Sequence, residues 1–314
     1  MIAVDTETTG VMFHDRAFLA SFAFRHGSEL RSHVAEIPAE VDVCRTVMEN
    51  MKPWLFHNAK FDLQKLIQAG VIKREQVSVD SFHDTQTIAY LINEHQELGL
   101  KKLAKNLLGE ETNELEAINQ EKKRLKKELG LQSVHDVSYD LIPREVLTPY
   151  ALKDAEFTLR LFEILYPLLP EEMYRLYDME RELILVLLDV EARGIKIDTA
   201  YLEEKEEEYR KKIFYKELEI KELAGDDDFN PNSPQQVLKW YEDNGYVILD
   251  TTRKSLVEAD VPLGLAIVEL KKMRKLHGTY MKGLLAEVHD GLVHPNFNPA
   301  RTKTGRMSSS GSAD

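Results

Sequence analysis

Two carboxylates follow the first apolar run of the chain, in the opening sequence MIAVDTETTG. Residues 2–4 predict a short buried strand, and residues 8–10 predict the turn after it. Because side chains alternate along a strand, Asp5 and Glu7 are expected to point to the same face. Like charges side by side repel each other and are costly to bury. The pair therefore indicates either a metal ion between the carboxylates or a strand end exposed to solvent.

Two later segments place an acidic residue four positions after a polar one. In HNAKFD, Asn58 precedes Asp62, and in YALKD, Tyr150 precedes Asp154. Residues four apart lie on the same face of a helix. We therefore expect each pair on one helical face, where the acid can meet the carboxylates of the first strand.

Such a set of acids supports metal-assisted hydrolysis. Carboxylate oxygens suit Mg²⁺ or Mn²⁺, with substrate phosphate completing the shell. Two such ions, about 3.5–4 Å apart, can clamp an in-line displacement at phosphorus, one supplying hydroxide and the other stabilising the leaving 3′-oxygen. Tyr150 would orient the attacking water, because an ordinary tyrosine pKa near 10 makes it a poor base. One strand and two helices are thus expected to bring together Asp5, Glu7, Asp62 and Asp154.

The segments that must position these residues predict an α/β unit over residues 1–170. A strand hairpin is expected in FLASFAFRHG and SELRSHVAEIP, and a short buried strand in WLFHN. Helices are expected in EVDVCRTVMENMKP, AKFDLQKLIQAG, DTQTIAYLIN, GLKKLAKNLLG and LTPYALKDAEFTLRLFEIL. In the last of these, Thr148 suits the N-cap and Pro149 suits the first helical position. The polar run EKKRLKKELG predicts a solvated helical insertion.

The sequence YPLLP at 166–170 predicts the end of this unit. Beyond it, EEMYRLYDMERELILVLLDVEARG and TAYLEEKEEEYRKKIFYKELEIKELAG predict two long helices. A turn-rich patch and a further helical region, GLAIVELKKMRKLHGTYMKGLLAEVHD, follow. We therefore expect a second, mainly helical unit over 171–293 and a polar, irregular segment over 294–314.

Length and composition narrow the class of protein. The 314 residues suggest about two domains, and the formal charge of −13 argues against a protein that merely coats nucleic acid. An enzyme that binds divalent metal can still be acidic overall. Cys44 is the only cysteine, which excludes an internal disulfide and a cysteine-cluster zinc site and fits a reducing cytoplasm. The sequence has no apolar run near the ~18 residues of a membrane span and no signal-peptide pattern, so we expect a cytoplasmic protein with no membrane partner.

The three acidic motifs, in their order, resemble those of the DEDD exonuclease superfamily, in the version with tyrosine in the third motif. The resemblance implies an α/β, RNase H-like fold with a mixed central sheet. It also implies that the four acids are metal ligands and that Tyr150 positions the water. Asn58 matches a family position near the substrate, and Val11 falls where members often place an apolar residue against the terminal base. His57 and His83 are interpreted as packing or surface histidines.

The second half of the chain resembles the thumb and the start of the palm of a family A, Klenow-type DNA polymerase. The resemblance rests on VEARGIKID, FNPNSPQQVLKWYEDNGY, KKMRKLHGTYMKGLL and DGLVHPNFNPARTKTGRMSSS, in that order. It implies an exonuclease domain at 1–170, a helical thumb at 171–293 and an incomplete palm at 294–314. Arg306 would contact the minor groove of the primer–template. From residue 270 onward, eight Lys and Arg outnumber three Asp and Glu, as expected where a protein holds phosphates.

The resemblance implies a proofreading 3′–5′ exonuclease that uses two Mg²⁺ or Mn²⁺ ions on the 3′ end of single-stranded DNA and also binds primer–template duplex. The sequence ends where a family member continues into the palm, so we expect no primer extension by this chain alone and a poorly ordered or loosely packed segment after His294. The first motif begins four residues after the start, a compactness that resembles a bacteriophage polymerase. Two alternatives remain open: an RNase D-like exoribonuclease, which TKTGRMSSS argues against, and the DNA-clamping piece of a split polymerase with a palm-and-fingers partner chain.

Overall fold

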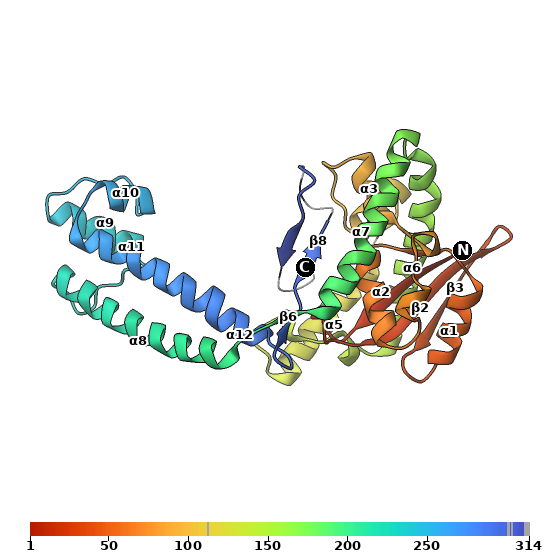
Figure 1. The fold of residues 1–314 in the computed structure, drawn as a ribbon, viewed down its shortest axis with the longest axis horizontal. Helices are drawn as coiled ribbons and strands as arrows, with labels where there is room; N and C mark the ends of the chain where they lie inside the picture. The colour runs from red at the N-terminus through yellow and green to blue at the C-terminus, as the bar shows by residue number, and fades with distance from the viewer. Residues whose placement is uncertain (112, 300–301, 303, 311–314) are drawn as a thin grey trace. The chain divides into compact units, whose positions relative to one another are not determined.

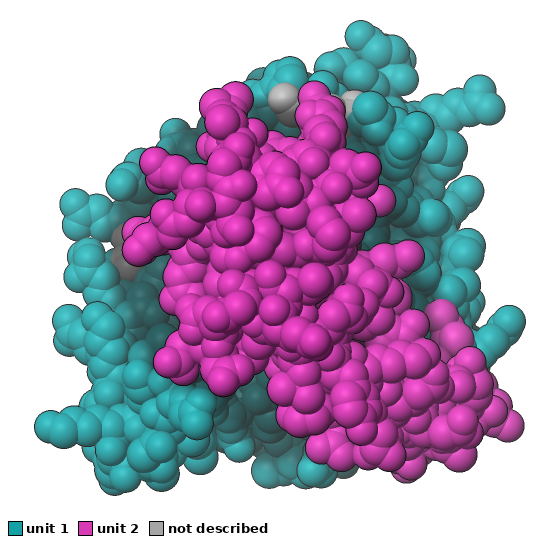
Figure 2. Space-filling model, turned by 90° about the vertical axis from the view of Figure 1, so that its left-hand side faces the viewer, with its two compact units in different colours: residues 1–194, 294–314 teal, residues 195–293 magenta. Residues whose placement is uncertain are grey.

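A computed structural model describes residues 1–111, 113–299, 302 and 304–310 (Figure 1). The chain forms two compact units, which Figure 2 colours separately. The first comprises Met1–Gly194 and the described residues from His294 onward, and the second comprises Ile195–Val293. No helix among the described residues is long and apolar enough to cross a membrane.

The first unit is built on a five-stranded mixed sheet in the order β3-β2-β1-β4-β5. The predicted hairpin is confirmed, because β2 (Ala17–His26) pairs antiparallel with β3 (Glu29–Glu36). The central strand β1 (Ile2–Thr8) runs antiparallel to β2 and parallel to β4 (Trp54–Phe56), which is parallel to β5 (Phe82–Asp84). The strand that carries the first motif therefore lies in the middle of the sheet.

Helices pack on both faces of this sheet (Figure 1). Alternate residues of β1 enter two different apolar cores: Ile2 and Val4 belong to one, with residues of α1, α2 and α7, and Ala3 belongs to the other, with residues of α3 and α6. The helices are α1 (Val41–Asn50), α2 (Ala59–Gln68), α3 (Thr85–Ile92), α4 (Leu100–Leu103) with a π-helical continuation to Leu108, α5 (Asn113–Leu129), α6 (Arg144–Leu168) and α7 (Tyr174–Arg193).

Helix α6 begins earlier than its sequence predicts. It starts at Arg144, so the prediction that Thr148 is the N-cap is wrong, and Pro149 lies inside the helix. A proline there has no N–H to donate to the helix. The first turn is held instead by tertiary packing, because Leu147 is fully buried against Ile118 and other residues of a separate apolar cluster.

Helix α5 is the predicted insertion, and its helical character is confirmed. It is solvated on one side only, because Ile118 and Leu125 are buried in the cluster that contains Phe18 of β2 and Ala151 of α6. The insertion therefore covers the part of α6 on which Tyr150 lies.

The compact units divide after Gly194 rather than at the predicted boundary of 170. Helix α7 stays with the first unit because Ile184 and Leu188 are buried in the same core as Ile2 and Val4. A domain cut at Pro170 would expose that core surface. The assignments of exonuclease, thumb and palm to the predicted ranges remain predictions.

The second unit is mainly helical. Its helices are α8 (Thr199–Ala224), α9 (Pro234–Asp243), α10 (Arg253–Glu258), α11 (Pro262–Lys275) with a π-helical continuation to Lys282, and α12 (Gly283–Glu287). Within this unit α8 and α11 lie side by side (Figure 1). Tyr241, Leu256 and Ile267 are buried in its core. Strands β6 (Ile195–Lys196) and β7 (Leu292–Val293) pair where the chain enters and leaves the unit.

The segment after Val293 returns to the first unit, with β8 (Asn296–Asn298) paired to β9 (Ser308–Ser310). The expectation of loose packing is wrong for its beginning. The His294 ring stacks on Phe13, with centroids 3.8 Å apart, and the Phe297 amide donates to the Glu191 carboxylate at 2.7 Å. Arg306 is exposed, and its carbonyl accepts a hydrogen bond from the Thr302 hydroxyl.

Candidate active site

Three carboxylates meet where β1 faces α6. Single ligand oxygens of Asp5, Glu7 and Asp154 all lie within 4.8 Å of one another. Asp5 and Glu7 continue the row of β1 side chains that Ala3 begins, so they point toward the α6 side of the sheet. Glu7 and Asp154 are 8% and 6% exposed, whereas Asp5 is partly exposed.

Asp62 approaches from α2, on the other face of β1. Its Oδ1 accepts hydrogen bonds from the backbone amide and the hydroxyl of Thr6, at 3.0 and 2.7 Å. Thr6 lies between the two motif acids and points to the α2 side, so it holds Asp62 against the strand. Asp62 is outside the group of three. Among the neighbouring charges, however, the charge of Asp62 raises the pKa of Asp5 the most.

All four acids have raised pKa values, and burial is the main cause. Burial raises the pKa of Glu7 to about 8, that of Asp62 to about 7 and that of Asp154 to about 6. The pKa of Asp5 is well above its usual range, through burial and then the charges of Asp62, Asp154 and Glu7. Four clustered carboxylates of this kind need added positive charge to ionise together. Hard oxygen donors fit Mg²⁺ or Mn²⁺ better than softer metals.

Lys101 supplies positive charge at the same place. Its Nζ donates hydrogen bonds to carboxylate oxygens of Asp154 and of Glu114 on α5. It also lies 4.2 Å from the centre of the Tyr150 ring. The sequence motifs do not include this residue, and nothing in LGLKKLAKNLL separates it from Lys102.

Tyr150 lies one helical turn before Asp154 on α6, as predicted. Burial, followed by the charges of Asp154 and Glu7, raises the pKa of its hydroxyl well above 10. The hydroxyl is therefore neutral near pH 7, and it can donate a hydrogen bond but cannot act as a base.

If Tyr150 orients the attacking water, as the motif resemblance implies, replacing it with phenylalanine is expected to slow 3′ hydrolysis by roughly 10²-fold without abolishing it, because one positioned hydrogen bond is removed. Single-turnover rates on a labelled oligonucleotide measure the change. Tyr166→Phe is the matched control, since Tyr166 lies on the same helix but packs on Phe162, with ring centroids 5.0 Å apart. A wild-type rate in Tyr150→Phe would reduce Tyr150 to a packed aromatic residue.

Asn58 does not lie on a helical face with Asp62, so that prediction is wrong. It precedes α2 with a left-handed backbone, φ 75° and ψ 57°. The cause is Asp84, whose carboxylate accepts from the backbone amides of Asn58 and Ala59 at 3.0 and 3.3 Å. The same carboxylate caps α3 through the Gln86 amide. Asp84 thus fixes the start of the helix that carries Asp62.

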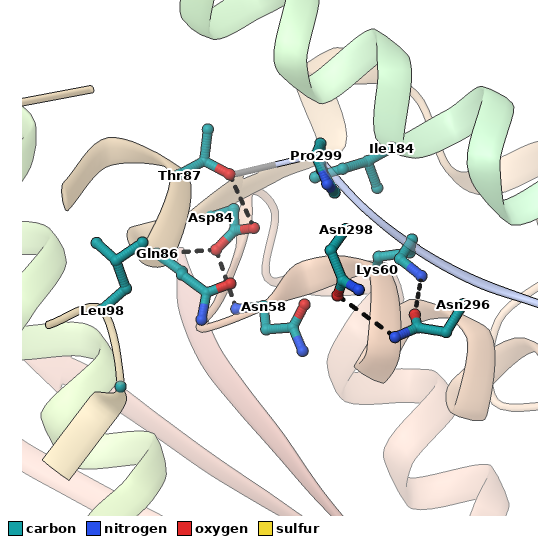
Figure 3. A pocket seen from close by; sticks show the side chains of 11 residues that line it. Asn58, Lys60, Asp84, Gln86, Thr87, Leu98, Ile184, Asn296, Asn298 and Pro299 are labelled. Carbon is teal, nitrogen blue, oxygen red and sulfur yellow. Dashed lines mark hydrogen bonds between the residues drawn. The ribbon is translucent and has the colours of Figure 1, made fainter. Parts of the chain in front are cut away.

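Asn58 lines a polar cavity of about 240 Å³ (Figure 3). The other polar side chains that line this cavity include Lys60, Gln86, Asn296 and Asn298. Lys60 bonds the Glu191 carboxylate at 2.6 Å and Asn296 Oδ1 at 2.5 Å. The cavity therefore lies between the start of α2 and the segment after residue 293, and residues of both line it.

Val11 is 42% exposed in the loop after β1. It lines a smaller hollow together with Asn58, Phe61 and other residues of α2. Val11 and Asn58 thus line one hollow, and their contacts with substrate remain predictions. Arg306 belongs to the described end of the same unit but lines neither hollow.

The two histidines interpreted as packing residues have protein partners. The His57 ring nitrogens lie 2.8 Å from the Thr85 hydroxyl and 2.8 Å from the Leu98 carbonyl. His83 lies among aromatic rings, stacked on Tyr177, and burial lowers its pKa to about 4. Neither belongs to the carboxylate group.

Comparisons with known proteins agree on one family. A family model described as 3′-5′ exonuclease matches residues 1–170, and a model described as DNA polymerase family A matches residues 199–312. The DNA polymerase of Escherichia phage T5 is 30% identical over 82% of this chain and 33% of its own length. DNA polymerase I of Pseudomonas aeruginosa is 27% identical over 99% of this chain and 36% of its own length.

A third relative, the DNA polymerase DpoZ of Salmonella phage PMBT28, is 27% identical over 97% of this chain and 51% of its own length. This chain therefore spans between about a third and a half of these relatives. Among solved structures, the POL domain of Pol1 from M. smegmatis, in complex with DNA primer-template and dNTP, matches with a TM-score of 0.72 and 20% identity. That match covers 98% of this chain and 51% of that one.

Proposed function

Because the chain belongs to the 3′-5′ exonuclease family of the family A DNA polymerases, we propose that its first unit removes nucleotides from the 3′ end of DNA by metal-assisted hydrolysis. The observation that carries this proposal is the group of three carboxylates with raised pKa values, with Asp62 beside it. These four acids are the ones that the sequence motifs assign as metal ligands.

In this proposal Asp5, Glu7, Asp62 and Asp154 hold two Mg²⁺ or Mn²⁺ ions. When bound, the ions supply a water of lowered pKa and stabilise the leaving 3′-oxygen. Tyr150, neutral because its pKa is raised, donates a hydrogen bond that orients the attacking water. Thr6 and Asp84 position Asp62 and the start of its helix.

Substrate contacts are assigned to the loop after β1 and the start of α2, the two segments that follow Glu7 and precede Asp62 in the chain. Val11 would pack against the terminal base, and Asn58 would bind the nucleotide next to it. Val11 and Asn58 line the same hollow, and Asn58 also lines the polar cavity in Figure 3. Amide side chains around that cavity offer donors and acceptors for bases and sugars.

A 5′-labelled single strand tests the proposal. With Mg²⁺ it should shorten from its 3′ end and release nucleoside monophosphates, and excess EDTA should stop the reaction. An RNA of the same sequence, assayed in parallel, separates this activity from that of an exoribonuclease. Equal rates with and without EDTA, or cleavage of RNA alone, would contradict the proposal.

We further propose that the second unit binds primer–template duplex through exposed basic residues of α11. Lys272 and Lys275 lie exposed in its last turns. Phosphate contacts of this kind release counterions, so the affinity falls steeply with salt. Arg306 is assigned to the minor groove near the primer terminus, and its replacement by alanine should also weaken duplex binding.

Replacing Lys272 and Lys275 with alanine is expected to weaken duplex binding. It should also flatten the logarithmic salt dependence by about 0.9 for each phosphate that the protein no longer neutralises. Fluorescence anisotropy of a labelled primer–template in EDTA, at salt concentrations from about 50 to about 200 mM, measures both effects. Lys211→Ala is the matched control, because Lys211 pairs with Glu207 on α8. If the wild type, the double variant and Lys211→Ala show the same dependence of duplex affinity on salt, the assignment of duplex binding to α11 is contradicted.

The relatives come from bacteria and bacteriophages. With a single cysteine, the chain suits the reducing cytoplasm of a bacterial or phage-infected cell. If a palm-and-fingers chain completes the enzyme, mixing the two should yield primer extension that Arg306→Ala weakens more than it weakens single-strand hydrolysis.

A further inference from the structure

Lys101 places an ammonium group among the clustered carboxylates, between two helices. It donates to Asp154 on α6 and, at 3.2 Å, to Glu114 on α5. The lysine and Glu114 side chains are only 16% and 13% exposed. Its Nζ also lies over the Tyr150 ring, at 4.2 Å from the centroid. The ammonium is therefore held at one place by an acid of the cluster, an acid outside it and an aromatic face.

The charge of this ammonium acts on three of the four acids. It lowers the pKa of Asp5, of Glu7 and of Asp154, against the stronger effect of burial. Lys122, a second cation near Glu7, lowers the pKa of that acid less than Lys101 does. Lys101 thus supplies one positive charge that favours the ionised form of these acids, whereas a bound divalent ion would supply two.

We propose that Lys101 is the internal counter-ion of the metal-free site, and that metal binding moves its ammonium from Asp154 to Glu114. The inference rests on the metal site assigned under the proposed function. An ion ligated by Asp154 carries two positive charges and repels an ammonium a few ångströms away. Glu114 lies outside the cluster and is already a partner of Lys101, so the lysine keeps one acceptor when it leaves the other.

This arrangement makes Lys101 a positioning residue with two opposite effects. Without metal it holds Asp154 and limits the mutual repulsion of the acids. During metal loading it competes with the ion, because both bind the same carboxylate. Glu114 favours loading, since it stabilises the lysine in the position it takes once the ion is bound.

Mn²⁺ titration by calorimetry at constant pH tests the competition directly, without substrate. Lys101→Met keeps the apolar stem and removes the charge, and it should tighten Mn²⁺ binding about tenfold, because the competing cation is gone. Glu114→Gln removes the alternative acceptor and should weaken Mn²⁺ binding severalfold. Lys102→Met is the matched control: it removes the same charge one residue along, from an exposed side chain paired with Glu97, and should change the affinity little.

Thermal unfolding gives a second readout. In EDTA, Lys101→Met should have a lower Tm than Lys102→Met, because the acids lose their counter-ion, and Mn²⁺ should then raise its Tm by more than it raises that of the wild type. Lys101→Arg keeps the charge and should restore the wild-type Mn²⁺ affinity. Far-ultraviolet circular dichroism confirms that each variant is folded before titration.

The results separate the inference from the proposed function. If wild-type protein binds no Mn²⁺, the metal site itself is wrong and the inference falls with it. If wild-type protein binds Mn²⁺ while Lys101→Met and Glu114→Gln both match Lys102→Met, the metal site stands and the role of Lys101 is overturned. Opposite shifts in the two variants, with rescue by Lys101→Arg, support the exchange of partners.

Discussion

Replacing Asp154 with asparagine is expected to lower the single-turnover rate of 3′ hydrolysis by about 10⁴-fold or more, because the proposed metal ligand is removed while the side chain keeps its size. Asp154 is one of the three acids whose oxygens lie within 4.8 Å of one another. Rapid-quench assays on a 3′-labelled single strand in Mg²⁺ measure the rate. Asp5→Asn should lower the rate by as much, and Asp62→Asn by nearly as much.

Glu156→Gln is the matched control for Asp154→Asn. It lies two residues along α6, where it bonds Ser32 and takes no part in the cluster. Its rate should stay within a few-fold of wild type. A folded Asp154→Asn protein that retains more than a tenth of the wild-type rate would contradict the assignment of Asp154 as a ligand.

Without divalent metal, the first unit is expected to lose stability as pH rises from about 4 to about 8. Burial raises the pKa of Glu7 from 4.5 to about 8 and that of Asp62 from 3.8 to about 7. Between its ordinary and its raised pKa, each of these acids binds more protons in the folded state than in the unfolded state. The free energy of unfolding therefore falls with rising pH in that window. Each pKa unit corresponds to about 1.4 kcal/mol, so the loss should amount to several kcal/mol.

Urea unfolding in EDTA at several pH values measures this loss. The chain has two tryptophans, and Trp54 is buried in the core of the first unit. A Trp240→Phe background therefore makes the fluorescence specific to that unit. Glu7→Gln should flatten the pH dependence, and Mn²⁺ should suppress it in protein that retains Glu7. Metal-free stability that is constant or rises between about pH 6.5 and about pH 8 would contradict the raised pKa values. That range lies above the ordinary histidine pKa, so the buried His83, whose pKa is lowered to about 4, does not offset the acids there.

The sequence was sufficient for features that depend on local patterns. Alternation along β1 places Asp5 and Glu7 on one face, and the spacing of Tyr150 and Asp154 places both on α6. The family comparisons and the mixed sheet confirm the α/β, RNase H-like fold followed by a helical unit.

Features that depend on distant contacts were missed. The early start of α6 follows from burial of Leu147 against Ile118, which local proline and threonine signals do not contain. The left-handed backbone of Asn58 follows from Asp84, which lies 26 residues further along the chain. Lys101 reaches Asp154 across 53 positions. Single-sequence patterns carry no information about pairs of this separation.

Anomalous diffraction at the manganese edge tests the central claim most directly. Crystals would be soaked with Mn²⁺ and a short oligonucleotide whose terminal linkage is a slowly cleaved phosphorothioate. The account predicts two anomalous peaks, bound by oxygens of Asp5, Glu7, Asp62 and Asp154 and adjacent to the terminal phosphorus. Peaks elsewhere, or none at these acids in crystals that hold the oligonucleotide, would contradict it.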